Sequence, residues 1–310
     1  MAIYPTRDLL SISSHVVHGK VGNDAIQFPL NIRHWNVDCI HTTNLSNHPG
    51  YKKFKGTKSS FQLIQDLYKG LTKIELRYDA AIVGYVASKQ VLEVIYTEIL
   101  AKLPKETIVV MDPIMGDNGK LYVEEALVPL YKHILRDQTC EGLINLVTPN
   151  QFEMEILTDV KIVDLDSLKQ AIVSFFELYR VQKVVITSVS FDDSDTVLCI
   201  GAGSDGEVFT IQGSRIDAVF SGSGDLFLGI LTDRFVKSHG DLKESLTHTM
   251  NVVHKVLENT CQLSANLQPK RYVGDKLYIP DLRLVESKFF LRDDSSDGIL
   301  DNLTTSTTFL

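Results

Sequence analysis

The sequence predicts an α/β protein with a central, mostly parallel sheet and helices on both faces. Short β-branched runs alternate with amphipathic stretches of helical length along the 310 residues. The composition, 44% hydrophobic and 23% charged, is enough to build one large core. No internal repeat or composition break divides the chain, so we expect a single domain over 1–291. A polar, flexible C-terminal tail is expected over 292–310, because its Asp, Ser and Thr residues offer little to bury.

The order of the elements follows from the hydrophobic pattern. A helix is predicted over 88–103, because apolar residues recur at helical spacing behind Ser88, which can cap the first turn. Two long helices are predicted over 225–237 and 242–263, after a hairpin formed by 196–200 and 208–211. The predicted strands before them are 9–13, 37–43, 80–86, 107–111, 143–148 and 183–187.

Charge and composition exclude several classes of partner. The net charge of −8 and the pI near 5.6 argue against nucleic acid or an anionic membrane as the main partner. The four cysteines lie far apart, without the spacing of a disulfide framework or a zinc site. No stretch has the pattern of a signal peptide or the length of a membrane span, so we expect a cytoplasmic protein, with the nucleus as a second compartment.

A glycine-rich segment over 201–206 matches Gly-x-Gly-x-x-Gly, the dinucleotide-binding fingerprint. The fingerprint requires a helix immediately afterwards, whereas residues 207–211 have the pattern of a strand. We therefore interpret 201–206 as the turn of the hairpin. The Walker A motif is absent from the chain.

A phosphate cradle is predicted where Gly222 and Gly224 precede the helix over 225–237. Free N–H groups at a helix start suit an anion, and glycine lets the backbone approach it. Asp225, in the first turn, has two interpretations on chemistry alone: a carboxylate that stabilises the helix dipole, or a group that acts on a substrate.

Two further motifs follow predicted strands. Asp112 and Asp117 are either ligands for Mg²⁺ and phosphates or the solvated acids of an Asp-Pro turn. Asn150 and Glu153 have the spacing of a capping box, although Glu153 could also supply an oxygen to a metal shell. Three histidines in N-terminal loops lack the spacing of a metal site, and we interpret them as ordinary hydrogen-bonded residues.

Together these motifs carry a family resemblance over about residues 8–285. The chain resembles the pyridoxal kinases, whereas the Gly-Ser-Gly-Asp run of 222–225 alone would indicate only the wider ribokinase-like superfamily. The matching segments, in order, are 11–16, 22–23, 46–48, 84–85, 112–117, 148–153, 185–188 and 222–227.

The resemblance implies a ribokinase-like three-layer α/β/α sandwich that forms a homodimer. It implies phosphorylation of the 5′-hydroxymethyl group of pyridoxal, pyridoxine and pyridoxamine. The phosphoryl donor would be ATP with Mg²⁺ or another divalent cation, and a monovalent cation such as K⁺ would assist.

The resemblance also assigns roles to individual residues. Asp225 takes the position of the catalytic base, and the anion hole is formed by Gly222, Ser223 and Gly224. The substrate is held by Ser14, Tyr85, Pro49 and Asp225. The metal ions are held by Asp112, Asp117, Thr148, Glu153 and Thr187. The residues along ATP are Asp112, Asn150, Glu153, Thr187, Ser188, Ile216, Asp217, Ala218 and Ser223.

Three departures from the family pattern affect these assignments. Ser223 replaces the usual Thr but keeps its hydroxyl, and the loop over 117–122 is short. Pro49 stands where the family has Thr, which removes a hydroxyl and a backbone N–H from the substrate loop. Two alternatives remain at this stage: another ribokinase-like enzyme such as a hydroxymethylpyrimidine kinase, and a vitamin B6-binding protein with weak turnover.

Overall fold

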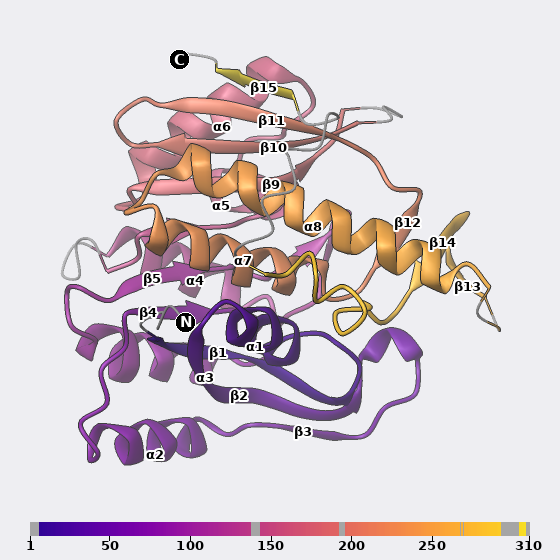
Figure 1. Cartoon of the computed structure of the whole chain (residues 1–310). Helices are drawn as coiled ribbons and strands as arrows, with labels where there is room; N and C mark the ends of the chain where they lie inside the picture. The colour runs from indigo at the N-terminus through magenta and orange to yellow at the C-terminus, as the bar shows by residue number, and fades with distance from the viewer. Residues whose placement is uncertain are drawn as a thin grey trace, which may run out of the picture.

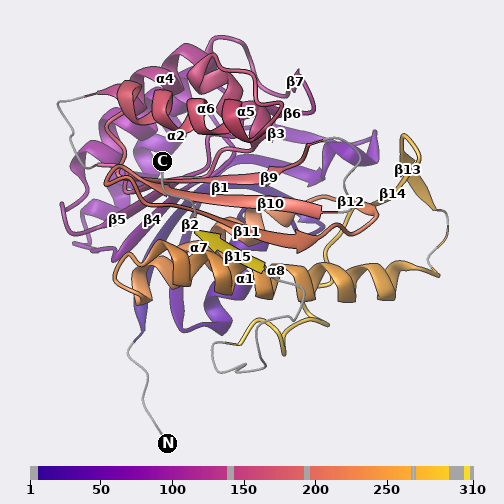
Figure 2. The same ribbon diagram turned by 90° about the horizontal axis from the view of Figure 1, so that it is seen from above.

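A ten-stranded sheet lies between two layers of helices (Figures 1 and 2). The computed structural model of the chain describes residues 6–137, 143–191, 196–266, 268, 270–292 and 304–307. The strand order is β15-β11-β10-β9-β8-β5-β4-β1-β2-β3. The strands from β2 across to β9 run parallel, and the remaining pairings are antiparallel. The predicted α/β/α sandwich is confirmed.

The elements of the large sheet match most of the expected strands. In spatial order they are β15 (Thr304–Thr307), β11 (Val208–Ser214), β10 (Thr196–Gly203), β9 (Lys183–Val189), β8 (Leu146–Val147), β5 (Ile108–Met111), β4 (Ala80–Val83), β1 (Arg7–His18), β2 (Trp35–Asn47) and β3 (Gly56–Lys58). The expected hairpin is confirmed as β10 and β11.

Each face of the sheet has its own hydrophobic core. One face packs against α1 (Asn23–Ile32), α7 (Ser223–Lys237) and α8 (Leu242–Ser264). The other face packs against α2 (Phe61–Thr72), α3 (Lys89–Val94), α4 (Leu127–Arg136), α5 (Gln151–Thr158) and α6 (Leu165–Leu178). Successive residues of the parallel strands point into opposite cores. Leu9 packs with α1 and α7, whereas Leu10 belongs to the core under α2 to α6.

Two small sheets extend from one end of the large sheet. One contains β12 (Ala218–Phe220), β14 (Lys276–Ile279) and β13 (Arg271–Val273), and the other contains β6 (Gly116–Asp117) and β7 (Lys120–Leu121). The second small sheet follows the carboxyl end of β5, and β12 to β14 lie toward the same side of the molecule in Figure 2.

Three elements differ from their predicted form. The helix expected over 88–103 begins at its predicted cap, Ser88, but continues as a π-helix (Ile95–Ile99) and a 3-10 turn. Its buried apolar residues come in pairs four positions apart (Val91, Leu92; Ile95, Tyr96; Ile99, Leu100), and the wider π turn keeps successive pairs on one face. The strand expected over 143–148 is reduced to β8.

The third difference concerns the C-terminal tail. Residues Thr304–Thr307 form β15, antiparallel to β11, whereas the sequence suggested no regular structure there. Without β15, β11 would be an edge strand with unpaired backbone groups, and β-branched Thr is well suited to pair with it. Residues 293–303 and 308–310 lie outside the described part of the chain, so a flexible tail remains a prediction for them.

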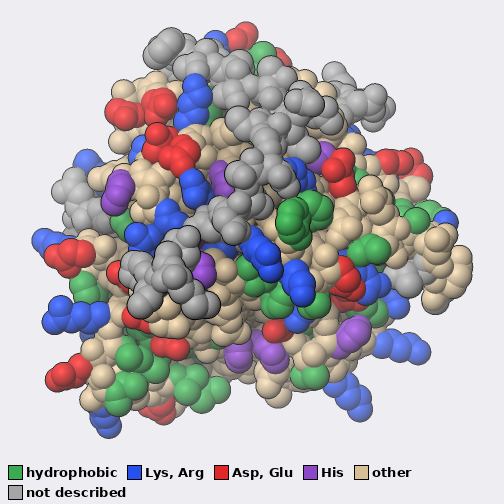
Figure 3. Space-filling model, in the orientation of Figure 1, with side chains coloured by type: hydrophobic (Ala, Val, Ile, Leu, Met, Phe, Trp, Pro, Cys, Tyr) green, Lys and Arg blue, Asp and Glu red, His purple; other side chains and the backbone are tan. Residues whose placement is uncertain are grey.

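The surface in Figure 3 shows acidic and basic side chains interspersed over one face of the molecule. Among the described residues, no helix combines the length and apolarity needed to cross a bilayer.

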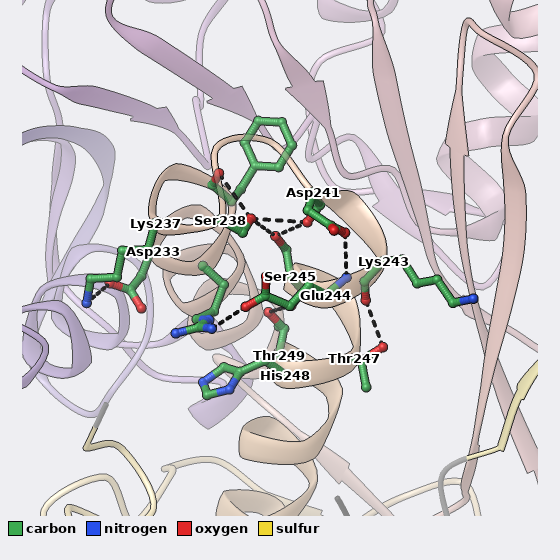
Figure 4. Close-up of polar contacts among 12 residues, drawn as sticks. Asp233, Lys237, Ser238, Asp241, Lys243, Glu244, Ser245, Thr247, His248 and Thr249 are labelled. Carbon is green, nitrogen blue, oxygen red and sulfur yellow. Dashed lines mark hydrogen bonds and ion pairs between the residues drawn. The ribbon is translucent and has the colours of Figure 1, made fainter. Parts of the chain in front are cut away.

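A buried ion pair connects the helix layer of α1, α7 and α8. The fully buried Arg33, at the end of α1, donates from Nε to Oδ2 of Asp233 in α7 at 2.5 Å. Oδ1 of Asp233 accepts from Trp35 Nε1 at 2.8 Å. It also accepts from Lys237 Nζ at 2.6 Å, as Figure 4 shows. Arg33 also contacts His248 of α8 at 2.9 Å. This network fixes α7 along its axis relative to α1.

We expect Asp233→Ala to lower the free energy of unfolding by about 3–5 kcal/mol, because it removes the buried carboxylate that accepts from Arg33, Trp35 and Lys237. Urea titration of both proteins measures the difference. The matched control is Lys132→Ala, which removes the ion pair of Lys132 with the 80% exposed side chain of Asp159 and should cost less than about 1 kcal/mol. Equal losses in the two variants would show that the Asp233 network does not hold the helix layer together.

Candidate active site

The predicted site residues come from loops at the carboxyl edge of the parallel strands. Ser14 lies near the end of β1, Tyr85 follows β4, and Asp112 follows β5. Thr148 and Thr187 lie at the ends of β8 and β9. In a parallel sheet these ends meet along one edge, which is where open α/β sheets bind ligands.

Asp225 lies in the first turn of α7, whose N-terminus faces this edge. Its Oδ2 accepts a hydrogen bond from the backbone N–H of Gly22 at 2.8 Å. Burial raises the pKa of Asp225 to about 6, and the Gly22 hydrogen bond opposes that rise. Gly222 is the N-cap of α7 and the Asp225 carboxylate bonds another segment, so Asp225 does not cap the helix. Its place in the first turn still fits the helix-dipole interpretation, and its position at this edge fits the functional one.

Gly22 is the partner of Asp225 that sequence reasoning did not identify. It lies at φ 57°, and a Cβ at this position would collide with the backbone and hydroxyl of Ser14. Only glycine fits that space, so its N–H reaches Asp225 from a loop 203 residues away in the sequence. The motif 22–23 was part of the family resemblance, but no local pattern indicates this contact.

The two glycines before α7 have different structural roles. Gly222 adopts φ 84°, a left-handed conformation, with the Lys20 carbonyl where a Cβ would be. A Cβ on Gly224 would meet no atom within 4 Å. The N-cap Gly222 has no side chain that could bond the first N–H groups of α7. This geometry fits the predicted anion hole of Gly222, Ser223 and Gly224.

Asp112, directly after β5, lies within the electrostatic reach of two other acids. Burial raises its pKa well above the usual range, and the charges of Glu153 and Asp225 raise it further. These three predicted site residues therefore form one cluster, in which the charges of Glu153 and Asp225 disfavour ionisation of Asp112. A cation would relieve this repulsion.

Glu153 is almost completely buried, with 2% of its surface exposed. Its Oε1 accepts from the N–H groups of Met115 (2.8 Å) and Gly116 (3.3 Å), and Oε2 accepts from Asn150 N–H at 2.9 Å. Burial raises its pKa to about 7 although these three hydrogen bonds oppose the rise. The predicted capping box is confirmed, and the same carboxylate also holds the loop after β5.

The loop after β8 and the end of β9 bring together three more predicted residues. Asn150 bridges to Thr187, whose N–H donates to the Pro149 carbonyl at 2.9 Å, and Ser188 follows at φ 58°. The Oγ1 of Thr148 is buried and has no hydrogen-bond partner among the described residues. An orphaned hydroxyl oxygen beside buried carboxylates fits an oxygen-liganded cation.

The predicted substrate residues lie at the β1 and β2 side of the edge. Tyr85 N–H donates to Oγ of Ser13, the neighbour of Ser14, at 3.2 Å. Pro49 opens a 3-10 turn (Pro49–Tyr51) as its first residue, where a missing N–H costs nothing. The side chain of Pro49 is exposed, and His48 caps the turn by accepting from Gly50 N–H at 3.1 Å.

The remaining site residues are less tightly assembled. Ile216 and Asp217 lead into β12, which begins at Ala218. Asp117 is exposed, and the backbone N–H of its neighbour Asn118 donates to its carboxylate.

Tyr122 was not among the predicted site residues. Burial raises its pKa, and the charges of Asp117 and Glu153 raise it further. Among the described residues no three His, Cys, Asp or Glu side chains form a ready-made metal site.

Comparison with known proteins places this edge in context. The family model described as phosphomethylpyrimidine kinase matches residues 39–271. Pyridoxal kinase of Ovis aries is 33% identical over 299 residues, covering 90% of this chain and 93% of the relative. Pyridoxal kinase of Homo sapiens is 32% identical over 304 residues, covering 92% and 95%. The chain belongs to the pyridoxal kinase family.

A solved pyridoxal kinase confirms the fold. The structure from Leishmania donovani, in complex with ADP and pyridoxamine, has a TM-score of 0.83 and 25% identity to this chain. The match covers 97% of this chain and 99% of that one. The edge that carries Asp225 and the predicted anion hole is also the edge at which most of the predicted site residues lie.

The raised pKa of Asp225 predicts that Asp225→Asn is more stable than the parent at neutral pH. A carboxylate with a folded pKa of about 6 against 3.8 costs folding free energy as the pH rises from about 4 to 6. Asparagine removes that cost and still accepts from Gly22. Between pH 4.5 and 7.5 the variant should therefore gain on the order of 2 kcal/mol in unfolding free energy relative to the parent.

Urea titration at several pH values measures this gain. The control is Asp217→Asn, at an exposed aspartate, which should shift stability by less than about 0.5 kcal/mol at every pH. A pH-independent difference for Asp225→Asn would show that its carboxylate ionises as freely in the folded protein as in the unfolded chain.

Proposed function

We propose that the protein transfers the γ-phosphoryl group of ATP to the 5′-hydroxymethyl group of pyridoxal, giving pyridoxal 5′-phosphate and ADP. Pyridoxine and pyridoxamine would serve as further substrates. The observation that carries the proposal is the pairing of an oriented carboxylate, Asp225, with an open anion cradle at Gly224 on one helix start. The ADP and pyridoxamine complex of the Leishmania donovani relative supports the same substrate pair.

Asp225 positions the alcohol and accepts its proton. Because Oδ2 is held by Gly22, Oδ1 is the oxygen left to face the hydroxymethyl group. The alcohol oxygen forms a bond to the γ-phosphorus as the bond to the β–γ bridging oxygen breaks, and the proton passes to Asp225. With a pKa of about 6, Asp225 is ionised at pH 7 and remains basic enough for this role.

The first N–H groups of α7 stabilise charge on the transferring phosphoryl group. Gly224 leaves space beside the backbone, and the helix dipole adds positive potential at this position. The Ser223 hydroxyl occupies the place of the family's usual Thr and could donate to the same anion. The protein's contribution is therefore alignment and charge stabilisation, which a loose phosphoryl-transfer transition state requires.

The carboxylate cluster fits a divalent cation that arrives with the nucleotide. We propose that Asp112 and Asp117 hold Mg²⁺, directly or through water, with Glu153 behind them and Thr148 and Thr187 available to a monovalent cation such as K⁺. Mg²⁺ usually binds one or two carboxylates together with phosphate oxygens, so a ready-made protein cage is not needed. When bound, it supplies positive charge against the phosphates.

We propose that Asn150, Ser188 and the segment of Ile216, Asp217 and Ala218 lie along ATP. We also propose that Ser14, Tyr85 and Pro49 line the pyridine ring. A homodimer and a cytoplasmic location, with the nucleus as a second compartment, complete the proposal. They rest on the family resemblance and on the sequence.

Asp225→Asn should lower the rate of pyridoxal phosphorylation by on the order of 100 to 10,000-fold, because the amide cannot accept the proton. A coupled assay of ADP release, run with all three vitamers and with hydroxymethylpyrimidine, measures the loss and the preferred alcohol together. ATP binding should be retained. Turnover of Asp225→Asn close to that of the parent would remove the residue from the reaction. A preference for hydroxymethylpyrimidine would favour the rival kinase.

A further inference from the structure

The segment after α8 reaches across to the loop that carries Pro49. We call residues 46–51 the substrate loop, and Arg271, Tyr278 and Asp281 the clasp. Tyr51 of the loop donates its hydroxyl hydrogen bond to Asp281, and the Arg271 guanidinium lies over the Tyr51 ring at 4.1 Å. Three side chains from one C-terminal segment therefore contact a loop more than 200 residues earlier.

Tyr278 also contacts the approach to the anion hole. Its hydroxyl lies 2.7 Å from Oγ of Ser221, the residue before Gly222. Its strand, β14, pairs with β12 in parallel register, with Val219 opposite Tyr278, and Ser221 N–H donates to Ile279 at 3.2 Å. Tyr278 is thus fixed to the strand that leads from Ala218 into the anion hole.

The same hydroxyl faces His48 of the substrate loop at 3.4 Å, and Ser221 Oγ lies at 3.4 Å from the same ring nitrogen. That nitrogen, Nδ1, accepts from Gly50 N–H, so it carries no proton in this arrangement. One of the two hydroxyls donates to the other at 2.7 Å, so a single hydroxyl proton is left to point at Nδ1. Burial lowers the pKa of His48, which favours this neutral form.

The fit between loop and clasp is close. A Cβ on Gly50 would collide with the Tyr278 hydroxyl, so the backbone of the loop lies directly against the tyrosine. Movement of the loop away from the anion hole would break the contacts of His48 with Ser221 and Tyr278.

We infer that Tyr278 is a positioning residue for the alcohol substrate, because its hydroxyl, through Ser221 and His48, holds the substrate loop at a fixed distance from the anion hole. This inference rests on the proposed function, in which the substrate loop contacts the pyridine ring. Tyr278 does not touch the reacting atoms. It therefore governs how tightly the alcohol binds, and leaves the chemical step and ATP affinity unchanged.

The test is Tyr278→Phe in the full-length chain, with Tyr272→Phe as the matched control. Tyr272 lies on the neighbouring strand β13, and 58% of its side chain surface is exposed. Loss of one neutral hydrogen bond should raise the KM and the Kd for pyridoxal by about 2- to 10-fold in Tyr278→Phe, with kcat and the KM for ATP within about 2-fold of the parent. Tyr272→Phe should match the parent in all four constants.

A double variant separates a shared contact from two independent effects. Ser221→Ala removes the partner of Tyr278, so Ser221→Ala with Tyr278→Phe should weaken pyridoxal binding no more than the stronger single variant. An unchanged pyridoxal KM in Tyr278→Phe overturns the inference. Equal losses in kcat and in the KM for ATP also overturn it, because a general loss of structure moves all constants together.

The Kd of the alcohol, measured by calorimetric titration without turnover, distinguishes failure of this inference from failure of the proposed function. If the parent does not phosphorylate pyridoxal, titration of pyridoxal and of hydroxymethylpyrimidine identifies the alcohol that binds. If Tyr278→Phe then binds that alcohol with a 2- to 10-fold higher Kd, the positioning role of Tyr278 is supported, although the proposed substrate or activity is wrong. An unchanged Kd would overturn the positioning role of Tyr278, whichever alcohol binds.

Discussion

Asp112, Glu153 and Asp225 are withdrawn from water at the carboxyl edge of the sheet, where the charges of Glu153 and Asp225 disfavour ionisation of Asp112. In the described part of the chain, backbone N–H groups donate to Glu153 and Asp225, and no cationic side chain pairs with the three acids. Folding must therefore hold them together against their own repulsion. A bound cation would relieve this repulsion, so the site favours binding of positive charge.

Contacts between α1 and α7 stabilise the fold against the repulsion among the buried acids. Arg33 and Asp233 fix α7 against α1 through a buried ion pair, and Gly22, just before α1, donates to Asp225 at the other end of α7. The position of the proposed base is therefore set by two contacts between the same helices. Glu153 serves the loops in a comparable way, because one carboxylate holds three backbone N–H groups from two loops.

Elements with a strong local signal could be predicted from the sequence. The hairpin at 196–211, the cap at Ser88 and the capping box of Asn150 and Glu153 each depend on residues close together in the chain, and each was confirmed. The π turn after α3 was missed because an apolar period of four residues resembles that of an α-helix. Pairing of β15 with β11 depends on an edge strand about 100 residues away.

The same distinction holds for the site. Motif residues such as Asp112, Asn150 and Asp225 could be named because they follow predicted strands or open predicted helices. Their partners could not, since Gly22 meets Asp225, and Tyr278 meets Ser221 and His48, only through tertiary packing. The resemblance predicts roles for these residues, and the structure adds the hydrogen bonds of Glu153 and Asp225 and the direction in which burial shifts the pKa of each acid.

We propose that the buried carboxylates bind a cation that enters with the nucleotide. The number of protons released when MgADP binds tests this proposal most directly. Calorimetric titration of MgADP at pH 7, in two buffers of different ionisation enthalpy, measures the protons released. The account predicts net release, because a bound cation lowers the raised pKa values of Asp112 and Glu153, and it predicts a smaller release from Asp112→Asn. Identical heats in the two buffers, or equal release from parent and variant, would contradict it.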